Sequence, residues 1–199
     1  MKQTFIALTF FLLSSCQSPQ EFNQLSQNTQ NQIQQCNNCH SKGQSVGAPS
    51  LLGLEEKYIN AQVKKYKLGI RGNSSSSKEA IAMGKAILHI DEYELKQINR
   101  WFAHQQALKS SEIKVTHKVG QELYEQKCYG CHEGSIGKFF TGSPSLQHLE
   151  SWYIVKQCQD FMEGRRGNHP DDKKGRKMAE RIKQVSMEEL REIATFLAN

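Results

Sequence analysis

Apolar residues recur at intervals of three or four along two stretches of the chain, residues 55–68 and 150–163. This spacing places the apolar side chains on one face of an α-helix. The positions concerned are Tyr58, Ile59, Val63 and Tyr66 in the first stretch and Trp152, Tyr153, Ile154 and Phe161 in the second. Two further apolar faces follow the sequences Asp91-x-x-Glu94 and Ser186-x-x-Glu189, which are typical of capping boxes at helix N-termini. The pattern therefore predicts an all-α protein.

The helical pattern occurs twice, and the two copies align without a gap. Residues 49–103, shifted by 95 positions, fall on residues 144–198. The matched pairs include Pro49 and Pro144, Leu51 and Leu146, Tyr58 and Tyr153, Gln62 and Gln157, Gly69 and Gly164, Arg71 and Arg166, and Ile98 and Ile193. A repeat of this kind indicates a duplicated structural unit. We therefore expect two tandem domains, residues 31–107 and 108–199, with a polar linker over residues 105–116.

The first 15 residues are typical of an export signal. A largely apolar run of nine residues, 5–13, follows Lys2, whereas a membrane-spanning helix needs about 20. They end in Leu13-Ser14-Ser15-Cys16, which resembles a bacterial lipobox. This resemblance implies cleavage before Cys16 and a lipid on its thiol; an ordinary signal peptide with a coincidental cysteine is the alternative. We expect a protein anchored by lipid on the periplasmic side, and Gln17 favours the outer membrane over the inner one.

A Gln/Asn-rich tether, residues 16–30, is expected between this signal and the first domain. Eleven of the 19 residues from 17 to 35 are Gln or Asn, so the early part of this stretch is too polar to bury a core of its own. The whole chain carries a formal net charge of +6. Its basic residues stand near acidic ones, without the basic, aromatic-interleaved run that favours nucleic-acid binding, so we expect no nucleic-acid partner.

Four of the six cysteines fall in two Cys-x-x-Cys-His motifs, residues 36–40 and 128–132. This motif is the attachment signature of c-type haem. Two thiols at this spacing reach the two vinyl groups of one porphyrin, and the next residue directs an imidazole at the iron. We therefore predict two covalent haem c groups, bound through Cys36, Cys39, Cys128 and Cys131, with His40 and His132 as iron ligands.

Three other kinds of cysteine site fit the pattern less well. A zinc ribbon places its Cys-x-x-Cys pairs about 15–20 residues apart, whereas 88 residues separate these two pairs. A thioredoxin-like motif needs a βαβ setting, and a structural disulfide needs no histidine beside it. The remaining Cys158 aligns with Val63 on an apolar helix face, which predicts a buried, inert thiol; a reactive thiol or an intermolecular disulfide is the alternative.

The repeat also indicates the second protein ligand of each iron. Met83 and Met178 coincide under the shift of 95 positions, whereas Met162 and Met187 fall on residues other than methionine. A thioether is a soft ligand that suits haem iron and raises its reduction potential relative to a second histidine. We therefore predict Met83 and Met178 as axial ligands, with His169 as the rival in the second domain.

Both halves of the chain resemble class I cytochrome c domains, and their tandem order resembles the dihaem cytochrome c4 family. The resemblance covers residues 36–199 and rests on the two haem motifs, the two methionines, the aromatic–Gly-x-Arg stretches and the sequences Pro49-Ser50-Leu51 and Pro144-Ser145-Leu146. It implies ligation by His40 with Met83 and by His132 with Met178. It also implies that the carbonyl groups of Pro49 and Pro144 orient the two histidines.

Several positions depart from the family pattern. Gly120 and Tyr124 fit a first helix that crosses the last one in the second domain, but their counterparts Asn28 and Gln32 make the first helix of the first domain weakly apolar. Ser41 and Glu133 replace the glycine that usually follows the motif histidine. The loop over residues 74–77 is expected to be mobile, which would let Met83 leave its iron.

The resemblance implies an electron carrier that cycles two irons between the ferrous and ferric states on the periplasmic side. Its expected partners are donor and acceptor redox proteins, including a terminal oxidase, and the membrane through the lipid on Cys16. We expect no enzymatic activity. A dihaem enzyme of the peroxidase or thiosulfate-oxidising type is one alternative, against which the paired methionines argue. A haem-bearing subunit of a larger oxidase or dehydrogenase is the other.

Overall fold

The computed structural model describes residues 22–107 and 117–198, and their regular structure is helical, without a strand. The all-α prediction is thereby confirmed for these residues. The predicted signal peptide, the predicted lipid site at Cys16 and most of the predicted tether lie outside the described residues, as does most of the predicted linker. In the described part of the chain, no helix has both the length and the apolar character needed to cross a bilayer.

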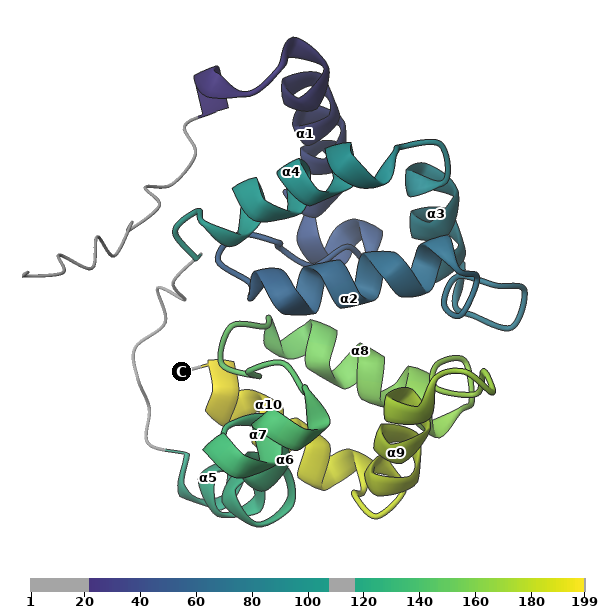
Figure 1. The fold of residues 1–199 in the computed structure, drawn as a ribbon. Helices are drawn as coiled ribbons and strands as arrows, with labels where there is room; N and C mark the ends of the chain where they lie inside the picture. Colours follow the sequence, from purple (N-terminus) through teal and green to yellow (C-terminus); the bar gives the residue numbers. More distant parts are fainter. Residues whose placement is uncertain (1–21, 108–116, 199) are drawn as a thin grey trace, which may run out of the picture.

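The first domain contains four α-helices and two short 3-10 turns. In chain order they are the turn Phe22–Gln24, α1 (Gln27–His40), the turn Gly43–Val46, α2 (Glu56–Lys67), α3 (Lys78–Ile87) and α4 (Glu92–Ala103). Helix α4 packs against α1 and α2, and α3 packs against α2 (Figure 1). The core between them is formed by Ile33, Leu54, Ile59, Ile98 and Phe102.

The second domain repeats the order of the helices. Its elements are α5 (Lys118–Tyr124), the π-helical turn Glu125–Tyr129, α6 (Gly130–His132), α7 (Ser135–Thr141), α8 (Ser151–Met162), α9 (Lys173–Ile182) and α10 (Met187–Ala198). The first three together take the place of α1, and α8, α9 and α10 take those of α2, α3 and α4. Helix α7 is longer than the 3-10 turn at the same point of the first domain. The two domains meet with α2 facing α8 (Figure 1).

The predicted capping boxes differ in completeness. Ser186 and Glu189 form a reciprocal box, because the Ser186 Oγ accepts from the Glu189 N–H at 3.1 Å and the Glu189 carboxylate accepts from the Ser186 N–H at 2.9 Å. The Asp91 Oδ1 accepts from the Glu94 N–H at 2.9 Å. The Glu94 carboxylate, however, accepts from the Thr29 hydroxyl at 3.3 Å and so joins α4 to α1. The second box is confirmed, and the first is only half formed.

The first domain begins earlier than the sequence predicts. Helix α1 starts at Gln27, where the Ser26 side chain accepts from the Thr29 N–H at 3.1 Å. The predicted boundary at residue 31 therefore falls inside α1. Only a few apolar side chains anchor this helix, but they are well buried: Ile33 is 1% exposed. A weakly apolar helix can dock in this way because Ile33 joins the core and α1 packs against α4.

The first and last helices of the second domain cross at a glycine, as the sequence predicts. A Cβ atom placed on Gly120 would lie only 2.2 Å from the Glu192 carbonyl oxygen and 2.8 Å from the Phe196 Cβ. The Tyr124 ring packs against the Phe196 ring at a centroid distance of 5.6 Å. Since glycine alone permits this approach, the contact between α5 and α10 depends on Gly120.

Candidate haem sites

Each motif histidine is held by the carbonyl group that the sequence predicts. The His40 Nδ1 lies 2.6 Å from the Pro49 oxygen, and the His132 Nδ1 lies 2.8 Å from the Pro144 oxygen. A carbonyl oxygen only accepts, so each Nδ1 is protonated and each Nε2 keeps a free lone pair. Burial lowers the pKa of both imidazoles, which favours the neutral form that binds iron. Both histidines therefore have the same tautomer, in which Nε2 is available for a metal bond.

The motif cysteines are available for thioether bonds. Cys36 and Cys39 lie three residues apart on α1, which places both thiols on one face of the helix, and His40 directly follows Cys39. Cys36 and Cys128 are half-buried, whereas Cys39 and Cys131 are exposed, and all four are free thiols. Burial raises the pKa of Cys36 and Cys128 to about 11. No disulfide joins the five cysteines in the described residues.

The two predicted methionine ligands occupy the same place in corresponding helices. Met83 is the sixth residue of α3, and Met178 is the sixth residue of α9. Both are half-buried. Of the other candidates, Met187 begins α10, and His169 lies in a loop with its Nδ1 3.8 Å from the Asp171 carboxylate. Ligation by Met83 and Met178 stays a prediction, which this equivalence supports.

These residues fit a haem better than a bare metal ion. Within residues 22–107 and 117–198, His, Cys, Asp and Glu side chains form no group of three that could hold a metal. A haem brings four nitrogen ligands of its own and needs only two more from the protein. The free thiols and the oriented Nε2 in each domain meet the requirements of covalent attachment and of one axial bond.

Glu133, which replaces the usual glycine, supports the second histidine. Its Oε1 accepts from the Ser145 hydroxyl at 2.5 Å and from the Leu146 N–H at 3.0 Å. These bonds hold the segment that follows Pro144, whose carbonyl orients His132. The sequence marks Glu133 as a departure but does not indicate this role.

In the first domain, the corresponding support comes from the other domain. The Ser50 N–H, which follows Pro49, donates to the Glu150 Oε2 at 2.7 Å. Glu150 precedes α8, 100 residues away in the sequence. Sequence reasoning missed Glu150, because nothing local connects it to the first haem motif.

A shared polar network joins the domains at the positions that the repeat matches. Arg71 donates to the Gln62 Oε1 at 2.9 Å and to the Gln157 Oε1 at 2.7 Å. Arg166 donates to the same two oxygens, at 3.0 Å and 2.7 Å. Each guanidinium also lies over an aromatic ring of its own domain, Arg71 over Tyr66 at 4.8 Å and Arg166 over Phe161 at 4.6 Å. The repeat thus predicts these residues as equivalent, but only the structure shows that the two copies share partners.

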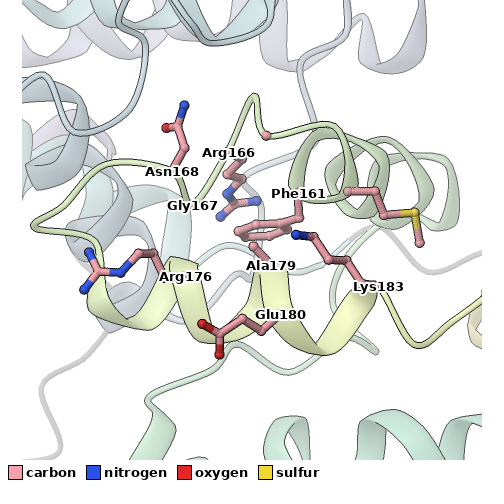
Figure 2. A pocket seen from close by; sticks show the side chains of 10 residues that line it. Phe161, Arg166, Gly167, Asn168, Arg176, Ala179, Glu180 and Lys183 are labelled. Carbon is pink, nitrogen blue, oxygen red and sulfur yellow. The ribbon is translucent and has the colours of Figure 1, made fainter.

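Figure 2 shows an open pocket beside this network, between the end of α8, the following loop and α9. The Arg166 guanidinium and the Phe161 ring lie at its centre, and Arg176 and Lys183 lie towards its margin. None of the predicted haem ligands is among its lining residues. The pocket therefore lies outside the predicted haem sites.

The structure describes two further segments near the sites. The loop predicted to be mobile is a hydrogen-bonded turn, in which the Asn73 Oδ1 accepts from the Ser75 N–H at 3.0 Å and the Ser76 Oγ accepts from the Gly72 N–H at 3.0 Å. Helix α7 packs closely on the second haem motif, since a Cβ on Gly137 would lie 1.7 Å from the Gly130 oxygen. Its outer side exposes Ile136, Phe139 and Phe140.

The chain is similar to known cytochromes along most of its length. Residues 118–199 match the family model for cytochrome c. Cytochrome c4 of Azotobacter vinelandii is 24% identical over 161 residues, which cover 74% of this chain and 77% of the relative. Cytochrome c4 of Pseudomonas aeruginosa is 27% identical over 150 residues, 69% of this chain and 71% of the relative.

The similarity extends to a solved structure. Cytochrome c4 of Acidithiobacillus ferrooxidans matches with a TM-score of 0.65 and covers 83% of this chain and 98% of its own, at 23% identity. At this identity the match shows a shared fold. Each domain of the chain also holds one haem-attachment motif and one histidine oriented by a proline carbonyl. The chain is therefore similar to the cytochrome c4 proteins in sequence and in fold, and it carries two c-type haem attachment motifs.

Proposed function

We propose that this protein carries single electrons between redox partners through two haems, each held by a histidine and a methionine. The observation that supports this most strongly is the matched pair of histidine–proline contacts, one beside each Cys-x-x-Cys-His motif. Each haem, when bound, supplies a ferrous–ferric couple. No substrate bond is made or broken in this reaction.

The protein's own groups set the conditions for that couple. The thiols of Cys36, Cys39, Cys128 and Cys131 would fix the haems covalently. The proline carbonyls accept from the histidine Nδ1–H groups, which orients each Nε2 and strengthens it as a donor. Met83 and Met178 would complete the axial pairs and raise the reduction potentials relative to histidine pairs. His132 is buried and His40 is half-buried, which limits solvent access to the two histidines.

The haem stoichiometry tests this proposal. The purified protein, produced with active cytochrome maturation, is expected to contain two haems per chain by haemochrome assay. A Cys128→Ala/Cys131→Ala variant is expected to contain one, since its second motif cannot form thioethers. Cys158→Ala is the matched control and is expected to keep two, because Cys158 is buried outside the motifs with a pKa raised by burial to about 12. Colourless protein, or protein that binds only zinc, would refute the proposal.

We further propose that the protein is exported and held at the membrane by a lipid on Cys16. Only residues 17–21 separate this cysteine from Phe22, where the described structure begins. Such a connection spans at most about 20 Å, at roughly 3.3–3.6 Å per residue. A lipid at Cys16 would thus keep the first domain close to the bilayer, within reach of membrane-bound donors or of a terminal oxidase.

Fractionation of cells tests the anchor. Cys16→Ser is expected to move most of the protein from the membrane fraction to the soluble fraction, because loss of the acyl chains removes about 0.8 kcal/mol for each buried methylene. Labelled palmitate should enter the wild-type protein and not the variant. Ser15→Ala, which keeps the cysteine, is the control and should remain in the membrane. Membrane retention of Cys16→Ser without label would contradict the anchor.

A further inference from the structure

The helices that carry the predicted methionine ligands both begin at a contact with the opposite domain. We propose that each domain positions the axial methionine of the other, through a lysine on its central helix that holds the first turn of the partner's methionine helix. Lys65 of α2 acts on α9 and Met178, and Lys156 of α8 acts on α3 and Met83. The inference rests on the proposed function, in which these methionines bind iron.

The contact on α9 is made at its N-cap. The Lys65 Nζ lies 2.7 Å from the Asp172 Oδ1, and the same oxygen accepts from the Gly175 N–H at 2.9 Å. The Asp172 side chain is only 6% exposed. One buried oxygen therefore joins the start of α9 to the central helix of the other domain.

In the contact on α3, the lysine belongs to the second domain and the carboxylate to the first. The Lys156 Nζ lies 3.1 Å from the Glu79 Oε2, and Glu79 is in the first turn of α3. The Glu79 side chain also packs on Gly47, where a Cβ atom would lie 2.6 Å from the Glu79 Cγ. Gly47 has a φ of 69° and so needs to be glycine for conformational reasons as well. Glu79 is thus fixed between its own domain and the lysine of the other.

The two contacts are not copies of each other. Under the repeat, Lys65 and Asp172 correspond to Asp160 and Ser77, and Lys156 and Glu79 correspond to Ala61 and Lys174. Duplication of a single domain therefore cannot explain both pairs. Each pair uses different residues to reach the same part of the methionine helix.

The position of the lysines matters more than the free energy of the pairs. Burial opposes the charged form of Asp172, but hydrogen bonds from Lys65 and from the Gly175 N–H outweigh it and lower the pKa of this carboxyl. Burial also lowers the pKa of Lys65, and together with the charges of Arg166 and Arg71 it outweighs the opposing effect of Asp172. The two shifts oppose each other, so the pair adds little net stability and mainly fixes geometry.

Short helices transmit such a constraint to the methionine. Glu79 precedes Met83 by four residues, about 6 Å along the helix axis, and Asp172 precedes Met178 by six, about 9 Å. Each helix has ten residues and moves as one unit over this length. Release of its first turn would shift the sulfur relative to the histidine on the other side of the haem.

The structure also indicates which methionine depends more on the other domain. The Lys67 Nζ donates to the Ile87, Leu88 and Ile90 carbonyl oxygens at 3.3, 2.7 and 2.7 Å and so holds the C-terminus of α3 within its own domain. Met162 takes the place of Lys67 in the second domain, and a thioether cannot donate these bonds. Loss of Lys65 should therefore affect Met178 more than loss of Lys156 affects Met83.

Three lysine-to-methionine variants of the full-length holoprotein test the proposal. Lys65→Met is expected to lower one of the two reduction potentials and to weaken the far-red band of methionine-ligated ferric haem. Lys156→Met is expected to lower the other potential by a smaller shift. Lys138→Met is the matched control, since it removes the interdomain contact of Lys138 with Glu55, which touches neither α3 nor α9. Lys65→Arg should restore the Lys65→Met changes.

Hydrogen exchange provides a readout that does not depend on redox activity. In Lys65→Met, the amides of α9 are expected to exchange several-fold faster than in Lys138→Met, while those of α3 stay unchanged. Equal amide exchange in α9 and equal reduction potentials in Lys65→Met and Lys138→Met would overturn the proposal. An equal change in the potentials of both haems in all three variants would overturn it as well. Absence of haem from the wild type would instead refute the proposed function, and the exchange of α9 would still test the contact.

Discussion

In Met178→Leu, the far-red band of the ferric protein is expected to fall to about half of its wild-type intensity, because one of two thioether–iron bonds is lost. The reduction potential of the second haem should fall as well, since the thioether stabilises the ferrous state. Exchange of methionine for leucine conserves volume and costs less than about 1.5 kcal/mol, so the fold should survive. Absorption spectra and a spectroelectrochemical titration measure both effects.

Met187→Leu is the control for this prediction. Met187 begins α10 and packs against the core, but it has no counterpart in the first domain. Its replacement should leave the band and both potentials unchanged. If His169 were the ligand instead, Met178→Leu would keep the wild-type spectrum, and His169→Gln would change it.

Gly120→Ala is expected to lower the free energy of unfolding of the second domain by about 3 kcal/mol or more, which exceeds the usual range for overpacking of 1–3 kcal/mol. The reason is the position of the added methyl group, 2.2 Å from the Glu192 carbonyl oxygen. A backbone oxygen inside α10 cannot rotate away as a side chain can, so α5 and α10 must separate. Denaturant unfolding of the holoprotein, followed by haem absorbance and by helical circular dichroism, measures the loss.

Gly130→Ala serves as the matched control for the crossing. Gly130 is also helical, with a φ of −54°, and an added Cβ atom would have no neighbour within 4 Å. In a helix this change is neutral or stabilising by up to about 1 kcal/mol. Similar destabilisation by both substitutions would show that the crossing does not depend on the glycine.

The parts of the protein that depend on short-range spacing can be predicted from the sequence. Two thiols and an imidazole must lie within five consecutive residues to bind one haem, so each motif identifies its site directly. The capping sequence at Ser186 and the matched positions of Met83 and Met178 are similar signals, because helix geometry relates neighbouring residues in a fixed way. The repeat then extends each prediction from one domain to the other, at the positions where the two copies are equivalent.

Only the tertiary structure decided the features in which the two copies differ. The contact between Lys65 and Asp172 joins residues 107 positions apart, and that between Ser50 and Glu150 joins residues 100 apart. The Lys65–Asp172 pair has no equivalent under the repeat. Ser50 and Glu150 correspond to Ser145 and Glu55, but Glu55 pairs with Lys138 instead, so the repeat could predict neither contact. The start of α1 before residue 31 has a related cause, since Ile33 is buried by packing on α4 rather than by the local composition. Side chains that meet only after the chain has folded leave no pattern in their own neighbourhood, and their positions follow from the packing of whole domains.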